Sequence, residues 1–176
     1  MARLPILEYP DPRLRLRCLP VEHFDEVLHR LVDDLFDTLY DTPGIGLSAP
    51  QTGALLRVLV TDLSGTASDP RVYVNPEILE SGVPGLVEES CLSIPGVTGN
   101  VIRATRLTVR AMDREGVPFQ RELEGMDAVC MQHEVDHLEG RLFIDRLSLF
   151  RRIQLKASAR LGAARGTTPA GARPSY

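Results

Sequence analysis

The stretch Gln132-His133-Glu134-Val135-Asp136-His137 contains the pattern H-E-x-x-H, and the rest of the chain is interpreted outward from it. On an α-helix, with roughly 3.6 residues per turn, His133 and His137 project from one face about one turn apart. Both imidazoles can therefore bind one divalent metal ion. Glu134 lies next to that face, where a carboxylate can take a proton from water that the metal has acidified. The stretch thus predicts a metal-dependent hydrolase.

The same pattern also arises by chance on the polar face of an amphipathic helix. Here, however, the residues that lead into it include the apolar Met126, Val129, Cys130 and Met131. Such a segment is typical of a largely buried helix, in which histidines without partners would be costly. Burial therefore favours a functional use of the two histidines.

A metal site needs a further ligand beyond the two histidines. No glutamate follows Glu139, which is too close to His137 to complete a thermolysin-like ligand set. Phe143 stands where a metzincin would have its third histidine. A generic HExxH peptidase therefore lacks its third ligand in this sequence.

A cysteine is the better candidate for the third ligand. Cys130 lies seven residues before His137, which places it about 10.5 Å away along the helix axis and makes joint coordination strained. Cys18 follows a basic run and has no catalytic residue beside it. Cys91 lies in the polar stretch Glu88–Ser93, which suits a thiolate. We therefore predict Cys91 as the third metal ligand.

Three blocks of the sequence resemble, in order, the signature motifs of the peptide deformylase family: Gly44–Gln51 (GIGLSAPQ), Glu89–Ser93 (ESCLS) and Gln132–His137 (QHEVDH). The resemblance extends from about Ile6 to Asp145. It implies a hydrolase that removes the N-formyl group from the N-terminal formylmethionine of nascent polypeptides and releases formate. It also implies one divalent metal per chain, Fe(II) in the cell, with zinc, nickel or cobalt as alternatives that the ligand set does not separate.

The resemblance also implies roles for individual residues. Glu134 is expected to be the general base, and the Gln51 amide and the Leu92 backbone N–H are expected to stabilise the oxyanion. Glu89 is expected to accept a hydrogen bond outside the metal's coordination shell, with Arg103 as its partner. The residues expected to bind the substrate are Ile45, Gly46, Val87, Met126, Val129 and Cys130. Gly46 would bond to the peptide main chain as to an added strand, whereas core packing alone would also explain Met126 and Val129.

Two positions depart from the family pattern. Ser48 stands where alanine is usual, and Ser90 stands where glycine is usual. If the backbone needs a positive φ at residue 90, Ser90 would be strained or would displace the amide of Leu92. These departures keep an alternative open, namely a catalytically impaired, deformylase-like protein that still binds metal.

The order of the expected elements predicts the fold class. Apolar spacing predicts an amphipathic helix from about Asp25 to Tyr40, which ends at Thr42-Pro43-Gly44. The expected strands are 55–62, 71–74 and 78–80, followed by a hairpin of 107–112 and 119–123. A helix, several strands and then the motif helix predict an α+β fold, with mostly antiparallel or mixed sheets around a central HExxH helix.

Composition and the lengths of apolar runs predict the number of domains and the cellular location of the protein. The 176 residues are 43% hydrophobic, which fits one globular domain. No apolar run approaches the ~20 residues of a membrane span, and the first residues lack the apolar core of a signal peptide. Three cysteines argue against a disulfide framework. We therefore expect a cytoplasmic protein that does not contact a membrane.

Charge divides the chain into two parts. Residues 1–145 carry 13 basic and 24 acidic residues, whereas residues 146–176 carry seven basic residues and no acidic one. We expect residues 1–147 to form the catalytic domain, and residues 148–176 to form a basic helix followed by a disordered tail. A solvated tail explains this charge, but a basic helix over residues 147–161 would also suit docking on ribosomal RNA, as in some deformylases.

Overall fold

The computed structural model describes residues 3–149 and 152. Residues Met1–Arg146 form one compact unit, which is separate from the residues that follow it. Most of the predicted basic helix and tail lies outside the described residues. No helix among the described residues is long and apolar enough to cross a membrane.

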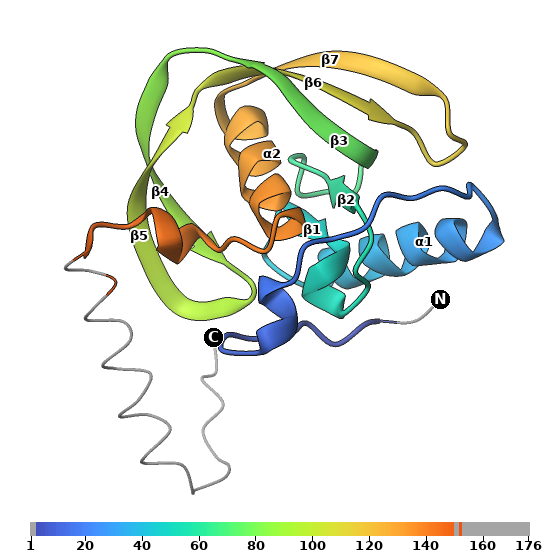
Figure 1. Ribbon diagram of the computed structural model, residues 1–176, viewed down its shortest axis with the longest axis horizontal. Coiled ribbons are helices and arrows are strands. Elements are labelled where there is room, and N and C mark those ends of the chain that lie inside the picture. Colours follow the sequence, from blue (N-terminus) through green and yellow to red (C-terminus); the bar gives the residue numbers. More distant parts are fainter. Residues whose placement is uncertain (1–2, 150–151, 153–176) are drawn as a thin grey trace, which may run out of the picture. The chain divides into compact units, whose positions relative to one another are not determined.

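The first unit contains two antiparallel sheets and two α-helices (Figure 1). The larger sheet has the order β1-β2-β3-β6-β7, and the smaller one pairs β4 with β5. The strands are β1 (Gly46–Ser48), β2 (Val58–Thr61), β3 (Arg71–Ser81), β4 (Pro84–Cys91), β5 (Ile94–Ala104), β6 (Arg106–Met112) and β7 (Pro118–Glu124). The helices are α1 (Glu26–Tyr40) and α2 (Gly125–Leu138), with short 3₁₀ turns at Pro12–Arg15, Ala49–Thr52 and Phe143–Arg146. The α+β prediction is confirmed.

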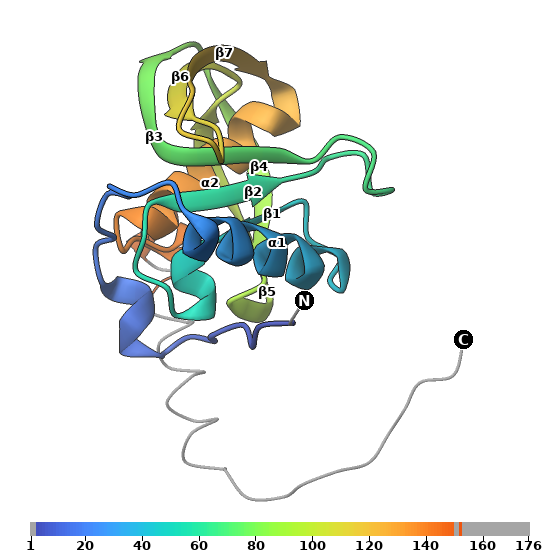
Figure 2. The ribbon, with the colours of Figure 1, turned by 90° about the vertical axis from the view of Figure 1, so that its right-hand side faces the viewer.

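The two helices pack on opposite faces of β2 (Figure 1, Figure 2). Successive side chains of a strand point to opposite faces, so Val58 and Val60 join the core cluster of α1, while Leu59 joins that of α2. All three side chains are fully buried. Helix α2 also contacts β5, and Figure 1 shows it between the β4–β5 hairpin and strands β1 and β2. The motif helix is therefore central, as predicted.

Helix α1 confirms the helix predicted from periodicity. Its N-cap is Asp25, whose carboxylate accepts hydrogen bonds from the backbone N–H groups of Val27 and Leu28 at 3.0 and 3.2 Å. Such a cap satisfies donors that the first helical turn leaves without partners. The helix ends at Tyr40, two residues before the Thr42-Pro43-Gly44 break.

The strands differ from the prediction in three places. The segments expected at 71–74 and 78–80 form one strand, β3, because Asn75-Pro76 produces a register shift and does not end the strand. Asn75 adopts a φ of +52°, and its side-chain amide pairs with the backbone N–H and carbonyl of Val21 at 2.8 and 2.9 Å. A bulge of this kind accommodates a proline that has no N–H to donate. The short strand β1 was not predicted, and neither were β4 and β5.

A glycine fixes the end of α2 against the N-terminal segment. Gly140 has a φ of +69°, and a Cβ there would lie 2.5 Å from the carbonyl oxygen of Arg15. Close by, the carbonyl of Leu138 accepts a hydrogen bond from the N–H of Cys18 at 2.9 Å. The backbones are thus too close for any side chain at position 140.

We expect Gly140→Ala to destabilise the protein more than Gly65→Ala. Gly65 has a similar φ of +67°, but a Cβ at that position would have no heavy atom within 4 Å. Gly65→Ala should therefore cost only the left-handed penalty of about 1–2 kcal/mol. Gly140→Ala should add the cost of moving the Arg15 backbone, about 1–3 kcal/mol more. Urea unfolding of both variants with the same metal loaded measures the difference, and equal losses would contradict the packing argument.

Candidate metal centre

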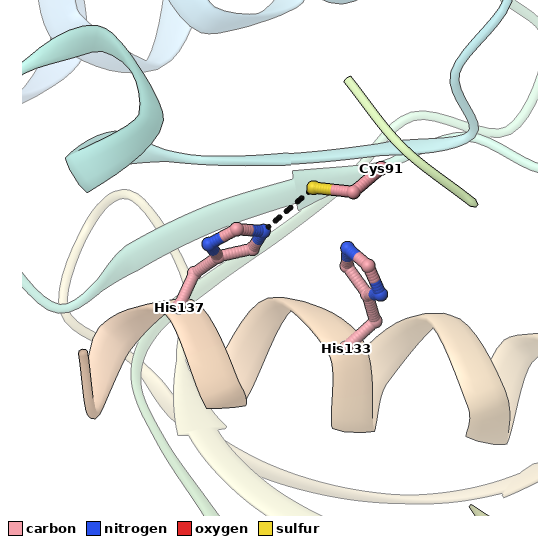
Figure 3. Close-up of side chains that lie close together, drawn as sticks. All are labelled: Cys91, His133 and His137. Carbon is pink, nitrogen blue, oxygen red and sulfur yellow. Dashed lines mark hydrogen bonds between the residues drawn. The ribbon is translucent and has the colours of Figure 1, made fainter. Parts of the chain in front are cut away.

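Three side chains from two distant segments converge beside α2. Helix α2 carries His133 and His137, and the end of β4 carries Cys91 (Figure 3). Their ligand atoms all lie within 4.8 Å of one another, and Cys91 Sγ lies 3.2 Å from His137 Nε2. In a tetrahedral site with metal–sulfur bonds of ~2.3 Å and metal–nitrogen bonds of ~2.0 Å, such atoms are about 3.5 Å apart. The donor set therefore fits one divalent ion.

The other two cysteines lie outside this cluster. Burial raises the pKa of the Cys18 thiol to about 11, and burial also raises the pKa of Cys130 well above its usual range. A thiol that resists ionisation is a poor metal ligand. The structure therefore brings the predicted cysteine, Cys91, next to the two histidines.

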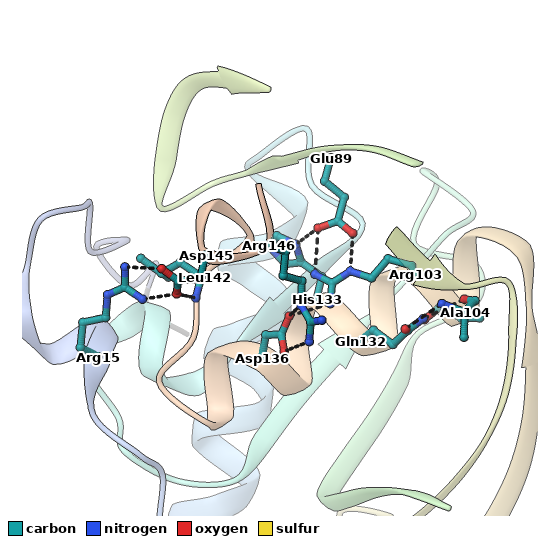
Figure 4. A network of polar contacts seen from close by, with 11 residues as sticks. Arg15, Glu89, Arg103, Ala104, Gln132, His133, Asp136, Leu142, Asp145 and Arg146 are labelled. Atoms are coloured by element: carbon teal, nitrogen blue, oxygen red, sulfur yellow. Dashed lines mark hydrogen bonds and ion pairs between the residues drawn. The ribbon is translucent and has the colours of Figure 1, made fainter. Parts of the chain in front are cut away.

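A buried charge network orients His133 (Figure 4). The Nδ1 atom of His133 lies 2.9 Å from Glu89 Oε2, which leaves the other ring nitrogen for a metal. Arg103 donates to both oxygens of Glu89 at 2.6 and 3.0 Å, as expected. Burial opposes ionisation of Glu89, but the hydrogen bonds from His133 and Arg103 outweigh it and hold the pKa at about 2.

The network extends beyond the residues that the sequence predicted. Arg103 also donates to Asp136 at 2.6 Å, and Arg146 donates to both oxygens of Asp136 at 2.6 Å. Asp136 is 5% exposed and Arg103 is 2% exposed. In the sequence, Asp136 within a buried helix could have indicated such a network, because a buried charge needs a partner.

Glu134 is a buried carboxyl of this site. Its side chain is buried, and its Oε2 atom has no hydrogen-bond partner among the described residues. Burial raises the pKa of the Glu134 carboxyl, although the nearby charge of His133 opposes the rise. A carboxylate whose pKa is raised by burial is a stronger base than one in water.

Gln51 is held by the unusual Ser48. The backbone N–H and the hydroxyl of Ser48 both donate to Gln51 Oε1, at 2.9 and 2.8 Å. The amide nitrogen of Gln51 is consequently directed toward Ser93 Oγ at 3.3 Å and Cys91 Sγ at 3.9 Å. Gln51 is therefore a buried donor beside the metal ligands, and Ser48 fits the site without disturbing it.

The backbone at Ser90, where the family usually has glycine, is not strained. Among the described residues other than glycine, only Ala67 and Asn75 have a positive φ. Ser90 has an extended backbone in β4, opposite Thr98, and its side chain is exposed. The backbone at this position therefore does not require glycine.

A cavity of about 610 Å³ opens beside the cluster. The residues with predicted catalytic or metal-binding roles that line it are Gln51, Cys91, Leu92, His133 and Glu134. Five of the six predicted substrate-binding residues also line it, namely Ile45, Gly46, Met126, Val129 and Cys130. Val87, the sixth, does not line it and lies opposite Val101 in the β4–β5 pair. The lining also includes Glu88, Ser90 and residues 94–98, which were missed because these strands were not predicted.

Glycine at position 46 is required by the packing of β1 on α2. A Cβ on Gly46 would lie 2.6 Å from Cys130 Sγ and 2.9 Å from Glu134 Oε1. No Cβ is tolerated at such distances from a helix that is buried on both sides. The missing side chain therefore lets the edge of β1 approach the base and the thiol directly.

Comparisons with known proteins agree with this geometry. Residues 3–152 match the family model described as polypeptide deformylase. The chain is 50% identical over 157 residues to the peptide deformylase of Alkalilimnicola ehrlichii, covering 89% of the chain and 88% of that relative. It is 48% identical over 158 residues to the enzyme of that name from Pseudomonas aeruginosa, covering 89% and 94%.

The similar solved structures are also peptide deformylases. The crystal structure of a peptide deformylase from Legionella pneumophila has a TM-score of 0.85 and 47% identity, covering 93% of this chain and 99% of that one. The peptide deformylase of Thermotoga maritima has a TM-score of 0.80 and 39% identity, covering 84% and 99%. The chain therefore belongs to the polypeptide deformylase family.

Proposed function

We propose that this protein removes the N-formyl group from the N-terminal formylmethionine of nascent polypeptides and releases formate. One observation carries the proposal: the metal-binding cluster, the buried carboxylate of Glu134 and the amide of Gln51 lie together at a single cavity. Membership of the family supports the same activity. A cytoplasmic location follows from the proposed substrate.

In this proposal Cys91, His133 and His137 hold one divalent metal, which is Fe(II) in the cell. One thiolate and two imidazoles suit iron, zinc, nickel and cobalt alike, so the choice of iron rests on the family. When bound, the metal supplies a Lewis acid that activates water and polarises the formyl oxygen. Glu89 supports this set because it fixes the ring of His133.

The remaining steps of the reaction are carried out by two side chains and one backbone N–H. Glu134 takes a proton from the attacking water through Oε2, which has no other partner in the described structure. The amide of Gln51 and the backbone N–H of Leu92 donate to the formyl oxygen as it becomes negative. The bond between the formyl carbon and the amine nitrogen then breaks, and Glu134 returns its proton to that nitrogen.

The peptide binds as an added strand. β1 is the edge strand of the larger sheet, and both β1 and β4 contribute to the lining of the cavity. An extended peptide between them can bond to the backbone at Gly46, which has no side chain in the way. The methionine side chain then enters the apolar part of the lining at Met126, Val129 and Cys130.

Formate release from a formyl-Met tripeptide tests this function directly. We expect release of formate and no hydrolysis of the same peptide without its formyl group. Cleavage of the unformylated peptide would indicate an HExxH peptidase. Metal retention without formate release would indicate the alternative that Ser48 and Ser90 suggested, a catalytically impaired protein that still binds metal.

We expect Glu134→Gln to retain its metal and to lose hydrolysis by about 10²–10⁴-fold, because general-base catalysis typically supplies that much. Asp127→Asn is the control, since Asp127 is also on α2 but pairs with Arg71. Metal content and formate release are measured on the same samples. Either loss of metal or retained turnover in Glu134→Gln would contradict the assigned role.

We expect Cys91→Ser to retain far less metal than Cys130→Ser or Cys18→Ser, because only Cys91 lies within the ligand cluster. All three cysteines are buried, so the variants are matched for burial. Metal content after dialysis against a weak chelator measures the effect. Equal retention in the three variants would show that the wrong cysteine was assigned.

The proposal includes contact with the ribosome through the basic C-terminal segment, which carries seven basic residues and no acidic one. The preceding part of the chain is acidic and would be repelled by RNA, so binding should depend on that segment and weaken with salt. Co-sedimentation with ribosomes is compared for the full chain and for a variant truncated before Ser148. Undiminished binding of the truncated variant would refute the role of the segment.

A further inference from the structure

The outer face of the β4–β5 pair exposes a band of apolar side chains. Leu86 and Ile102 are opposite each other in the strand register and are 72% and 65% exposed. These two residues are called the apolar band below. Neighbouring large apolar side chains that remain in solvent commonly mark a binding surface.

The apolar band lies on the same strand that lines the cavity. Residues 88–91 of β4 all line the cavity, and so does Thr98, which is opposite Ser90. Side chains of alternate residues share a face of a strand, so Leu86 lies on the same side of β4 as Glu88 and Ser90. Following β4 away from the metal ligands therefore leads from the cavity to the band.

The edge of β4 that leads there is open. Within the described part of the chain, no backbone hydrogen bond joins β4 to any element other than β5. β4 ends at Cys91, beside the reacting groups, so a peptide that pairs with its free edge can extend only toward Pro84. A peptide residue opposite Leu86 would share its face and contact its side chain.

We propose that the apolar band binds an apolar side chain of the substrate about four residues downstream of the residue opposite Ser90. This inference rests on the proposed function and deepens it. At ~3.3 Å per residue, Leu86 lies about 13 Å from Ser90 along the strand. If methionine fills the pocket and the second or third residue faces Ser90, then the sixth or seventh residue reaches the band. A tripeptide is too short to reach it.

A second copy of the chain fits the apolar band less well. Stable interfaces bury ~800 Å² on each partner, and two side chains supply only a small part of that area. The substrate, in contrast, already occupies the adjoining cavity, so the band needs to add only one side-chain contact. Continuity with the cavity therefore favours the downstream part of the substrate.

The test uses formylated heptapeptides that begin Met-Ala-Ser and carry either leucine or serine at both the sixth and seventh positions. We expect the wild type to bind the leucine peptide about fivefold more tightly, seen as a lower KM at similar kcat, because one leucine side chain becomes partly buried. The same preference should appear in calorimetry with the unformylated heptapeptides, a readout that does not depend on catalysis. Equal affinities for the two peptides would overturn the proposal.

Leu86→Ser/Ile102→Ser should lose the preference for leucine and keep the wild-type rate on the formyl-Met tripeptide. Val27→Ser is the matched control, because Val27 is 71% exposed but lies on α1. Sedimentation of each variant reports the oligomeric state. A double variant that keeps the preference, or that changes only its oligomeric state, would refute the band as a substrate site. A wild type that prefers the leucine peptide in calorimetry but releases no formate would contradict the proposed function alone.

Discussion

The metal site depends on one buried guanidinium, that of Arg103. It bonds to Glu89 of β4 and to Asp136 of α2, so β5, β4 and the motif helix meet at a single side chain. Removing one partner of such a network leaves an unpaired buried charge, which typically costs about 3–5 kcal/mol. The network therefore fixes the small sheet against α2. Because Cys91 follows Glu89 closely in β4, the same contact sets how near the thiol lies to the histidines.

On the opposite side of α2, packing and not charge determines how closely the neighbouring strand β1 approaches the helix. Gly46 lets β1 lie against Cys130 and Glu134 at distances that no side chain would permit. One face of the helix is thus held by ion pairs to the β4–β5 hairpin, and another by a glycine contact to the larger sheet. With both constraints present, ligand atoms from separate segments lie within 4.8 Å of one another. The protein scaffold therefore preorganises the site.

Sequence patterns predicted the parts of this arrangement that rest on local signals. The spacing of His133 and His137 and the periodicity of α1 are such signals, and both agree with the structure. The β4–β5 hairpin was missed because its prolines and glycines normally mark loops, and because its strands are stabilised by pairing with each other. The bond between Arg146 and Asp136 was missed because charge pairing depends on the tertiary fold.

Placing α2 between the two sheets leaves one edge of β1 and one edge of β4 without a partner strand in the described structure, and unpaired strand edges are usually a liability. Here both edges line the cavity. In the proposed function, a peptide bound between them is recognised chiefly through its backbone, which is the same in every sequence. The apolar recess at Val129 and Cys130 would then contact its first side chain. Such a site suits the proposed substrate, since nascent polypeptides share their first residue and differ in all that follow.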